Sequence, residues 1–378
     1  MHWVSALSRM TDLDRALDEA TEQVRTEFAG SAPNLVVTFV SQHHHAEFHQ
    51  VPAGLRRAFP NATLIGCSAG GVIGAGREVE DAPGLSITAA ELPGVTITPV
   101  RVTTEAMPFV PSDPPPAWLL FADPFSFDTD RFLGALDRAF PGSVSIGGLA
   151  SGGQESGEIA LFLNDELYLD ALVGVALTGN LTVDTIVAQG CRPIGQPMFV
   201  TRCEGNVLHE LDGRRAVVTL QGMHDMLSAR DQELMRHSMS LGVVMQESKE
   251  EYRHGDFLIR NVLGIDPRHG SLAVGTTLRE NQVVQFHVRD ARASAEEVTT
   301  LLARYGEHPA GGLLFSCLGR GQHLYGTADH DTDAFRAAVG DVALGGFFCN
   351  GEIGPVQGRT FLHGYTSAFG FFRPRLQH

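Results

Sequence analysis

The stretch Arg57-Ala58-Phe59-Pro60 recurs verbatim as Arg138-Ala139-Phe140-Pro141. Four residues after each occurrence comes an Ile-Gly pair, Ile65-Gly66 or Ile146-Gly147, and five residues further on comes Gly71 or Gly152. A looser version reads Ala337-Ala338-Val339-Gly340, with Gly346 and Gly351 at similar spacing. Chance explains so many aligned positions poorly, so we interpret the chain as containing an internal repeat.

The residues around each occurrence have the same pattern. An apolar run typical of a buried strand lies upstream, a helical stretch such as residues 130–140 leads into the motif, and another strand pattern lies downstream. The upstream runs are residues 35–40, 118–122 and 312–315, and the downstream runs are residues 85–90, 171–177 and 365–372. The repeat is therefore predicted to be a β-α-β-β unit.

A strand–helix–strand unit with short connections normally forms a parallel, right-handed crossover, whose turns gather at one sheet edge where α/β folds bind ligands. We therefore expect the turns 66–71, 147–153 and 346–351 to help line a pocket. They would contribute Cys67, Ser68 and Ser151. The alternative is that their glycines merely permit tight turns and close packing.

Outside the repeats, the patterns predict an amphipathic helix near residues 11–28 and a hairpin turning at Asn164-Asp165. Residues 257–265, 271–274 and 283–288 resemble a meander, and the proline-rich stretch 108–116 is typical of a loop. A helix near 214–237 marks the boundary between the halves. The predicted fold is α/β (mixed α+β) with mixed parallel and antiparallel sheets, divided into an N-terminal helix (1–30) and two domains (31–213 and 214–378).

The charge balance argues against two classes of partner. The 378 residues include 44 acidic and 28 basic side chains, which gives a formal net charge of −16. Such a surface repels phosphate backbones and anionic lipid, so we expect neither nucleic acid nor membrane to be a partner. An odd number of widely spaced cysteines, five in all, and no evident secretion signal predict reduced thiols in the cytoplasm.

Three segments near the carboxyl end are distinctive motifs: Leu314-Phe315-Ser316-Cys317-Leu318-Gly319-Arg320-Gly321, Gly346-Phe347-Phe348-Cys349-Asn350-Gly351-Glu352-Ile353-Gly354-Pro355 and Leu362-His363-Gly364-Tyr365-Thr366-Ser367. They closely resemble the C-terminal domain of the FIST (F-box and intracellular signal transduction) family. Gly66-Cys67-Ser68-Ala69-Gly70-Gly71 is similar to the N-terminal FIST domain. The resemblance covers roughly residues 33–373.

The resemblance implies a bacterial-type sensory module that binds a small molecule such as an amino acid or a derivative. Related proteins work with histidine kinases, cyclic-dinucleotide enzymes or chemotaxis proteins, and one subset resembles haem-binding nitric-oxide sensors. This sequence shows no kinase, cyclase or F-box pattern, so its output would pass through a separate partner. We expect a sensor rather than an enzyme, with no cofactor; the haem sensor remains an alternative.

Several residues near the third repeat are candidate ligand contacts. Arg320 lies between Gly319 and Gly321, which would let a ligand approach the backbone, and a guanidinium can hold a carboxylate or phosphate by two hydrogen bonds. The alternative is an internal salt bridge, for example to Glu352. Asn350 and Glu352 would orient the rest of the ligand, unless Asn350 only adopts a left-handed turn.

Cys317 and Ser68 are candidate nucleophiles, and each also has a structural interpretation. Cys317 ends a strand six residues before His323, and a Cys/His pair supports a cysteine-dependent enzyme as an alternative. Ser68 fits the G-x-S-x-G pattern of a nucleophile elbow, but Val72-Ile73-Gly74-Ala75-Gly76 is a poor helix to follow it. We expect a structural thiol and a turn, with no catalytic residue.

The histidines offer metal and haem alternatives. His43, His44, His45 and His49 form a cluster, and His45 and His49 would be one turn apart on an α-helix, as a metal pair would be. No third ligand of suitable spacing accompanies them, so a solvated or pocket-lining polar segment is the preferred interpretation, and no metal is predicted. Haem would need an axial ligand in an apolar cavity, and the sequence does not rank the candidates His209, His224 and His363.

Overall fold

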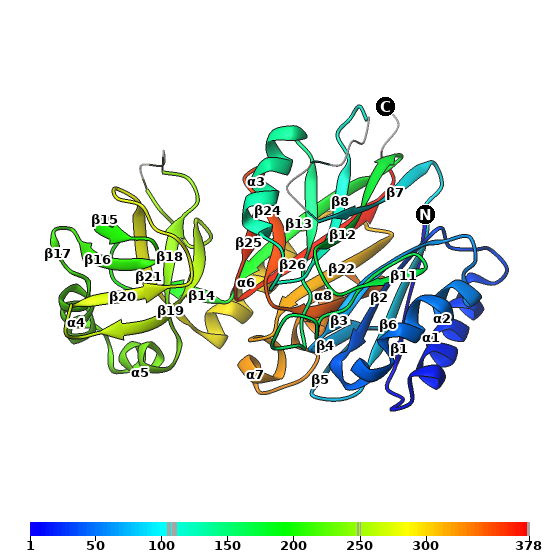
Figure 1. The fold of residues 1–378 in the computed structure, drawn as a ribbon, viewed down its shortest axis with the longest axis horizontal. Helices are drawn as coiled ribbons and strands as arrows, with labels where there is room; N and C mark the ends of the chain where they lie inside the picture. Colours follow the sequence, from blue (N-terminus) through cyan, green and yellow to red (C-terminus); the bar gives the residue numbers. More distant parts are fainter. Residues whose placement is uncertain (104–106, 108–111, 248, 250, 376–378) are drawn as a thin grey trace. The chain divides into compact units, whose positions relative to one another are not determined.

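The computed structural model describes residues 1–103, 107, 112–247, 249 and 251–375 of the chain (Figure 1). Two compact units are present: unit 1 consists of Met1–Val187 and Val298–His378, and unit 2 consists of Ala188–Glu297. Part of the predicted proline-rich loop, residues 108–111, lies outside the described residues. The division into family domains at 213/214 stays a prediction, because the compact units are a different kind of division.

Three segments of unit 1 share the predicted order of strand, helix, strand and strand, with an additional hairpin before the last strand that the predicted unit did not include. Copy A (residues 35–91) comprises β2 Leu35–Ser41, η1 Gln42–Gln50, α2 Val51–Ala58, β3 Thr63–Ala69, β4 Gly71–Gly74, β5 Arg77–Glu80 and β6 Leu85–Glu91. Copy B (residues 117–179) comprises β8 Ala117–Ala122, α3 Thr129–Ala139, β9 Val144–Leu149, β10 Leu161–Leu163, β11 Glu166–Tyr168 and β12 Leu172–Gly179. Copy C (residues 311–373) comprises β22 Gly311–Cys317, α7 Gly321–Tyr325, α8 His330–Val339, β23 Leu344–Cys349, β24 Glu352–Val356, β25 Arg359–His363 and β26 Thr366–Arg373.

The strands of the three copies pair in the same way. In each copy the first strand is parallel to the second, as a strand–helix–strand crossover requires. The last strand of each copy is antiparallel to the first. The predicted α/β class with mixed parallel and antiparallel sheets is therefore confirmed.

Each copy gives its hairpin to another copy's sheet. The hairpin β4–β5 of copy A joins β23 of copy C, β10–β11 of copy B joins β3 of copy A, and β24–β25 of copy C joins β9 of copy B. The exchange is cyclic and yields three six-stranded sheets in unit 1. No copy completes its own sheet without a neighbour.

The three sheets share an aromatic core. Phe39, Phe121 and Phe315 occupy the same position in the first strand of copies A, B and C and are fully buried. Their ring centroids lie 5.3 Å (Phe39–Phe121), 6.0 Å (Phe121–Phe315) and 6.4 Å (Phe39–Phe315) apart. Aromatic rings prefer such spacings, and equivalent residues thus meet where the copies converge.

One glycine of each copy is required by strand packing. A Cβ on Gly66, Gly147 or Gly346 would lie only 1.9, 1.8 or 1.8 Å from a carbonyl oxygen of the neighbouring parallel strand. These glycines begin the segments predicted to line a pocket, but at these three positions the close-packing interpretation is correct.

The amino-terminal segment extends the sheet of copy A. The predicted amphipathic helix is α1 (Leu13–Phe28), which begins at the N-cap Asp12 and buries one face. It packs on β1 (His2–Ser8) and beside α2, at the blue end of Figure 1. Strand β1 was not predicted; it pairs antiparallel with β6. Strand β7 (Val95–Val102) occupies the matching edge of the copy B sheet, beside β12.

Unit 2 is a closed antiparallel barrel with two helices. Strand β21 pairs with both β18 and β15, so the order β21-β15-β16-β20-β19-β18 returns to its start. The predicted meander is therefore wrong in one pairing, because β20 lies between β19 and β16. The elements are β14 Cys191–Pro193, β15 Met198–Glu204, β16 Val207–Leu211, β17 Arg214–Arg215, α4 Ala216–Met226, α5 Ala229–Ser238, β18 Met239–Val244, β19 Phe257–Asp266, β20 Ser271–Val274 and β21 Val283–Arg289.

Two elements cross the boundaries between the units in sequence, namely β13 (Thr182–Gln189) and α6 (Ala291–Ala303). Strand β13 is the edge strand beside β26 in the copy C sheet, as β1 is beside β6. Unit 2 is thus an insertion between the edge strand and the first strand of copy C. Among the described helices, none is both long and apolar enough to cross a membrane.

Candidate functional site

Copy C has polar side chains at four buried positions where the other copies have apolar ones. The shared register and the position of the repeat motif establish which residues correspond. The four residues, each followed by its counterparts in copies A and B, are Ser316 (Val40, Ala122), Asp331 (Val51, Phe132), Glu352 (Val72, Leu161) and Ser367 (Leu85, Leu172). All of them are at most 1% exposed. The fold therefore does not require polar groups here.

An ion pair lies at the centre of this polar cluster. Arg320, which is 0% exposed, donates from Nε to Asp331 Oδ2 at 3.1 Å and from Nη2 to Asp331 Oδ1 at 3.2 Å. Arg320 Nη2 also lies 2.6 Å from the Tyr325 hydroxyl. The predicted alternative of an internal salt bridge for Arg320 is thus observed, with Asp331 rather than Glu352 as its partner.

Asp331 is held ionised by its surroundings. Burial opposes its charge, but Arg320 and the hydrogen bond from His330 hold the pKa of this carboxyl well below its usual value. Ser367 and Ser316 also donate hydrogen bonds to its Oδ2. The rings of His330 and Tyr325 stack with centroids 3.5 Å apart. Asp331 therefore organises the polar cluster.

Glu352 is the second buried carboxyl of the cluster. It accepts hydrogen bonds from the Thr366 backbone N–H at 3.0 Å and from Thr366 Oγ1 at 2.7 Å. Burial raises the pKa of Glu352 to about 7, although the Thr366 hydrogen bonds and the charge of Arg320 act in the other direction. This carboxyl consequently changes its charge near neutral pH.

Cys317 lies beside Glu352 at the end of β22 and is partly exposed. Burial and the neighbouring Glu352 raise the pKa of the Cys317 thiol to about 12, although the Gly319 N–H donates to its sulfur. Its register partner on β23 is Cys349, a buried thiol that interacts electrostatically with both Cys317 and Cys67. These three cysteines therefore lie in one region of unit 1.

The predicted turn residues lie where the three copies meet. Ser151 Oγ in copy B accepts from the Gly70 N–H of copy A at 2.8 Å and donates to the Phe348 carbonyl of copy C at 2.5 Å. Ser68 Oγ donates to the Ser151 carbonyl at 3.3 Å. The turns meet, and at Ser68 and Ser151 they interlock by hydrogen bonds in the buried interior. Their role in lining a ligand pocket stays a prediction.

Ser68 is not arranged as a nucleophile elbow. It is 0% exposed, and the segment after it continues into strand β4 instead of the helix that such an elbow needs. Asn350 is exposed, and its Nδ2 donates to the Ala150 carbonyl at 3.2 Å. Asn350 is not in the left-handed conformation; in this region Tyr365 is, with φ of 62°.

A hairpin of copy A braces the segment that carries Arg320. The carboxylate of Glu80 accepts from the Gln322 N–H at 2.8 Å, and that of Glu78 accepts from the Thr332 N–H at 2.8 Å. Gly321, at φ +56°, would place a Cβ only 2.4 Å from the Glu80 carboxylate. Burial and the nearby Asp331 raise the pKa of Glu78 to about 8.

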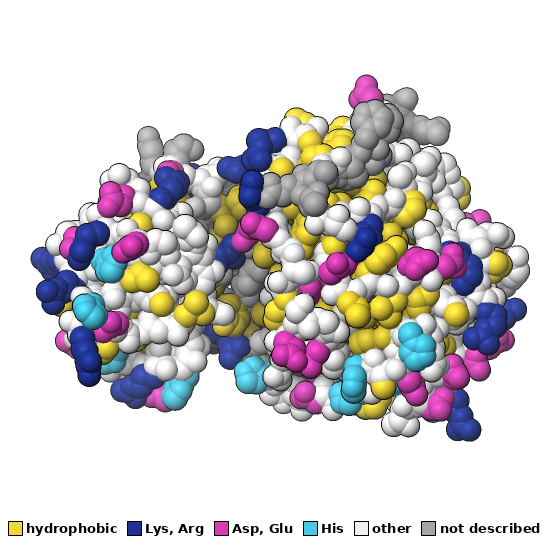
Figure 2. Space-filling view, in the orientation of Figure 1, with side chains coloured by type: hydrophobic (Ala, Val, Ile, Leu, Met, Phe, Trp, Pro, Cys, Tyr) yellow, Lys and Arg dark blue, Asp and Glu magenta, His cyan; other side chains and the backbone are white. Residues whose placement is uncertain are grey.

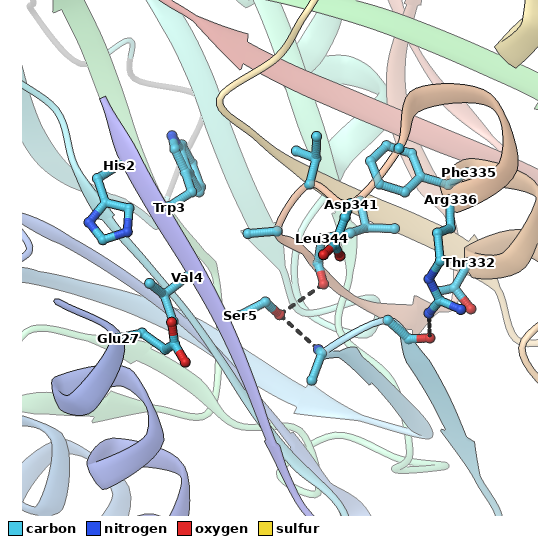
Figure 3. A pocket seen from close by; sticks show the side chains of 15 residues that line it. His2, Trp3, Val4, Ser5, Glu27, Thr332, Phe335, Arg336, Asp341 and Leu344 are labelled. Carbon is cyan, nitrogen blue, oxygen red and sulfur yellow. Dashed lines mark hydrogen bonds between the residues drawn. The ribbon is translucent and has the colours of Figure 1, made fainter.

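Two of the hollows in unit 1 are lined by other residues. One of about 310 Å³ lies beside β1, where Ser5 Oγ donates to the Leu344 carbonyl at 2.8 Å and accepts from the Ala75 N–H at 3.0 Å (Figure 3). The other, of about 890 Å³, is lined by His45 and His49 together with Gly152. His45 and His49 are exposed and line this hollow, so the segment is both solvated and pocket-lining.

The histidine segment is the 3-10 helix η1, not an α-helix. With three residues per turn, His45 and His49 do not stack above one another as expected for a metal pair. Within the described part of the chain, no group of three His, Cys, Asp or Glu side chains is arranged to hold a metal ion. Of the other candidate histidines, His363 Nε2 lies 3.0 Å from the Gly354 carbonyl, while His209 and His224 belong to unit 2.

Sequence reasoning missed Asp331, Tyr325 and His330. A signal was available for Asp331, because alignment of the repeats places this charged residue where the other helices have Val51 and Phe132. Tyr325 lies in a segment without a counterpart in the repeat pattern, and the repeat alignment of His330 with Gln50 and Arg131 gave no reason to single it out.

Comparison with known proteins agrees with this architecture. The FIST N domain matches residues 34–214 and the FIST C domain matches residues 219–355. An uncharacterized protein of Mycobacterium tuberculosis strain H37Rv is 35% identical over 384 residues, which cover 97% of this chain and 98% of the relative. An uncharacterized protein of Mycobacterium bovis is 34% identical over 379 residues, or 96% of each chain. FIST domains are associated with signal transduction and small-ligand sensing, and the chain belongs to the FIST family.

Proposed function

We propose that this protein senses a small, amino-acid-like ligand through the polar cluster of copy C and signals through a separate partner. The observation that carries this proposal is the replacement of apolar by polar residues at four buried positions. A buried ion pair is often no more stabilising than apolar residues of similar size. Copies A and B adopt the same fold with apolar residues at the four corresponding positions, so stability alone does not explain the polar cluster.

The charges of the cluster suit a zwitterionic ligand. Glu352 would accept a hydrogen bond from the ligand ammonium group, and Arg320 would attract the ligand carboxylate. Asn350 and Cys317, at the accessible face, would orient the rest of the ligand. Gly319 and Gly321 allow the segment around Arg320 to approach the ligand closely. Arg320 and Glu352 both have internal partners in this structure. Ligand groups would exchange with those partners, and this exchange would couple binding to a change of conformation.

A sensor agrees better with the thiol than an enzyme does. A nucleophilic cysteine reacts as the thiolate. Because the pKa of Cys317 is raised to about 12, this thiol remains protonated at neutral pH. We therefore assign Cys317 to the ligand site and propose no catalytic residue.

Haem is not part of the proposal. Haem requires an apolar enclosure with an axial ligand. The histidines that line the larger hollow, His45 and His49, are exposed and stand among polar side chains such as Glu155 and Glu158. These residues do not fit the group.

The partner is proposed to be a histidine kinase or a cyclic-dinucleotide enzyme in the cytoplasm. The net charge of −16 supports a protein partner over nucleic acid or an anionic membrane. All five cysteines lie among the described residues and none forms a disulfide, which supports a reducing compartment. Affinity capture from the source cell, with and without ligand, tests whether such an enzyme is retained in a ligand-dependent way.

Thermal unfolding with a panel of amino acids tests the ligand assignment. A ligand at a hundredfold excess over its Kd stabilises the folded state by about 2.7 kcal/mol. We expect Glu352→Gln to abolish this stabilisation and the exposed control Glu166→Gln to retain it. Equal stabilisation of both variants would refute the assignment of Glu352, and loss of the effect on Arg320→Lys would support the role of Arg320.

A further inference from the structure

The larger hollow of unit 1 lies at the carboxyl edge of copy A, the edge at which parallel α/β sheets bind ligands. We call it the copy A groove. It has a volume of about 890 Å³ and is bounded by η1, by the loop between β9 and β10, and by β11. Its lining includes Gln42, Phe48, Glu155, Glu158, Leu167 and Leu169.

The corresponding place in copy C is occupied by the protein itself. There the donated hairpin carries Glu78 and Glu80, whose carboxylates bind backbone N–H groups of the segment after β22. In the copy A groove, Leu167 and Leu169 correspond to Glu78 and Glu80. The register establishes this correspondence through the rows Gly66–Phe162–Leu167 and Gly346–Ile73–Glu78.

Leucines in place of the bracing carboxylates leave an apolar surface in the groove. Phe48 is 6% exposed and Leu169 is 48% exposed. Around β11 in unit 1, the space-filling view shows apolar side chains gathered in one area, with acidic side chains above and histidines below (Figure 2). The hydrocarbon part of a ligand would lie on this surface.

One polar atom of the lining requires a hydrogen-bond donor. Gln42 Oε1 is buried and has no hydrogen-bond partner among the described residues, although Gln42 Nε2 reaches the Glu158 carbonyl at 3.4 Å. An unsatisfied buried acceptor is costly. This atom has almost no accessible surface, so the Gln42 side chain must turn toward the groove for a ligand to donate to it. Glu155 and Glu158 add two carboxylates, and the described lining contains no lysine or arginine.

We propose that the copy A groove binds a small organic cation, an ammonium group on a short hydrocarbon chain. The Gln42 side chain would turn so that the ammonium donates to its Oε1, and the ammonium would face Glu155 and Glu158. The hydrocarbon chain would lie on Phe48, Leu167 and Leu169. This site is separate from the polar cluster of copy C and does not depend on the function proposed for it.

Isothermal titration of the full chain with n-pentylammonium tests this proposal, with pentanoate as the matched anion. We expect saturable binding of the cation and none of the anion. Gln42→Leu removes the acceptor and should weaken binding by about tenfold, the order expected for one charged hydrogen bond. Glu155→Gln should weaken it less, because that carboxylate is exposed.

Two further variants keep the proposal separate from folding defects and from the copy C site. Leu169→Gln alters an exposed side chain and should weaken pentylammonium binding without changing the far-ultraviolet circular dichroism spectrum. Glu352→Gln should leave the affinity for pentylammonium unchanged. Equal binding of pentylammonium and pentanoate, or unchanged affinity in both Gln42→Leu and Leu169→Gln, would overturn the proposal.

Discussion

Arg320 holds Asp331 through two hydrogen bonds, of 3.1 and 3.2 Å, between side chains that are almost completely buried. At the position of Asp331 the other two copies of the repeat have Val51 and Phe132. The charge pair is therefore a property of copy C and not of the repeated fold. This comparison within a single chain separates residues that build the repeat from residues that specialise one copy.

The first prediction concerns the energetics of this pair. Asp331→Val leaves the Arg320 charge buried without its main counter-ion, and we expect a loss of about 3–5 kcal/mol in the free energy of unfolding. The double variant Arg320→Met/Asp331→Val should recover most of that loss, since it replaces the buried ion pair by apolar side chains, like those at the position of Asp331 in copies A and B. Urea unfolding measures both, and a double variant no more stable than Asp331→Val would contradict this account.

The second prediction concerns the pH dependence of stability. The pKa of Glu352 is raised from its ordinary value of 4.5 to about 7, so the folded protein retains a proton that the unfolded chain has released. The free energy of unfolding should therefore decrease as the pH rises from about 4.5 to 7, by at most about 1.4 kcal/mol per pH unit. Glu352→Gln should flatten this interval. An unchanged slope in that variant would show that Glu352 is ionised in the folded protein.

The third prediction concerns the same effect at Glu78. Burial and Asp331 raise its pKa to about 8, so its destabilising effect should extend to a higher pH than that of Glu352. Glu78→Gln should make the free energy of unfolding less dependent on pH between 7 and 8, a range in which Glu352→Gln has a smaller effect. Thermal melts at half-unit pH steps provide the comparison.

The fourth prediction concerns the glycines between parallel strands. Gly66→Ala would place a Cβ 1.9 Å from the Thr38 carbonyl oxygen, so the two strands must separate. We expect a loss of several kcal/mol, at least about 3. Gly222→Ala, on helix α4 with no atom within 4 Å of the added Cβ, is the matched control and should be neutral or stabilising by up to about 1 kcal/mol. Similar behaviour of the two variants in urea unfolding would contradict the packing role of Gly66.

The fifth prediction concerns the exchange of hairpins. A fragment covering residues 298–378 lacks the copy A hairpin that pairs with β23, so we expect it to remain unfolded in isolation. Unit 2 has a closed barrel with its own core, and a fragment covering residues 188–297 should fold. The dispersion of amide signals in NMR spectra distinguishes the two outcomes. A folded 298–378 fragment would show that copy C does not need its neighbour.

The sequence by itself determined the repeated unit. The verbatim motif at Arg57 and Arg138, with apolar runs at strand length on either side, was sufficient to predict the order of strand, helix and strand and their parallel pairing. Local periodicity carries this information, because a buried strand and an amphipathic helix impose different spacings on apolar residues. The sequence also predicted that the histidine segment is solvated or lines a pocket, and His45 and His49 are exposed and line a hollow.

Only the tertiary structure decided where each hairpin pairs and which charges meet. The edge of β23 can accept any antiparallel strand of suitable register, and nothing in the residues of β4 states that its partner lies in copy C, more than 260 residues away in the sequence. The partner of Arg320 was equally undetermined, because Asp331 and Glu352 were both compatible with the sequence. A hydrophobic pattern specifies which face of a strand or helix is buried, but the neighbour it is buried against depends on the packing of the whole chain.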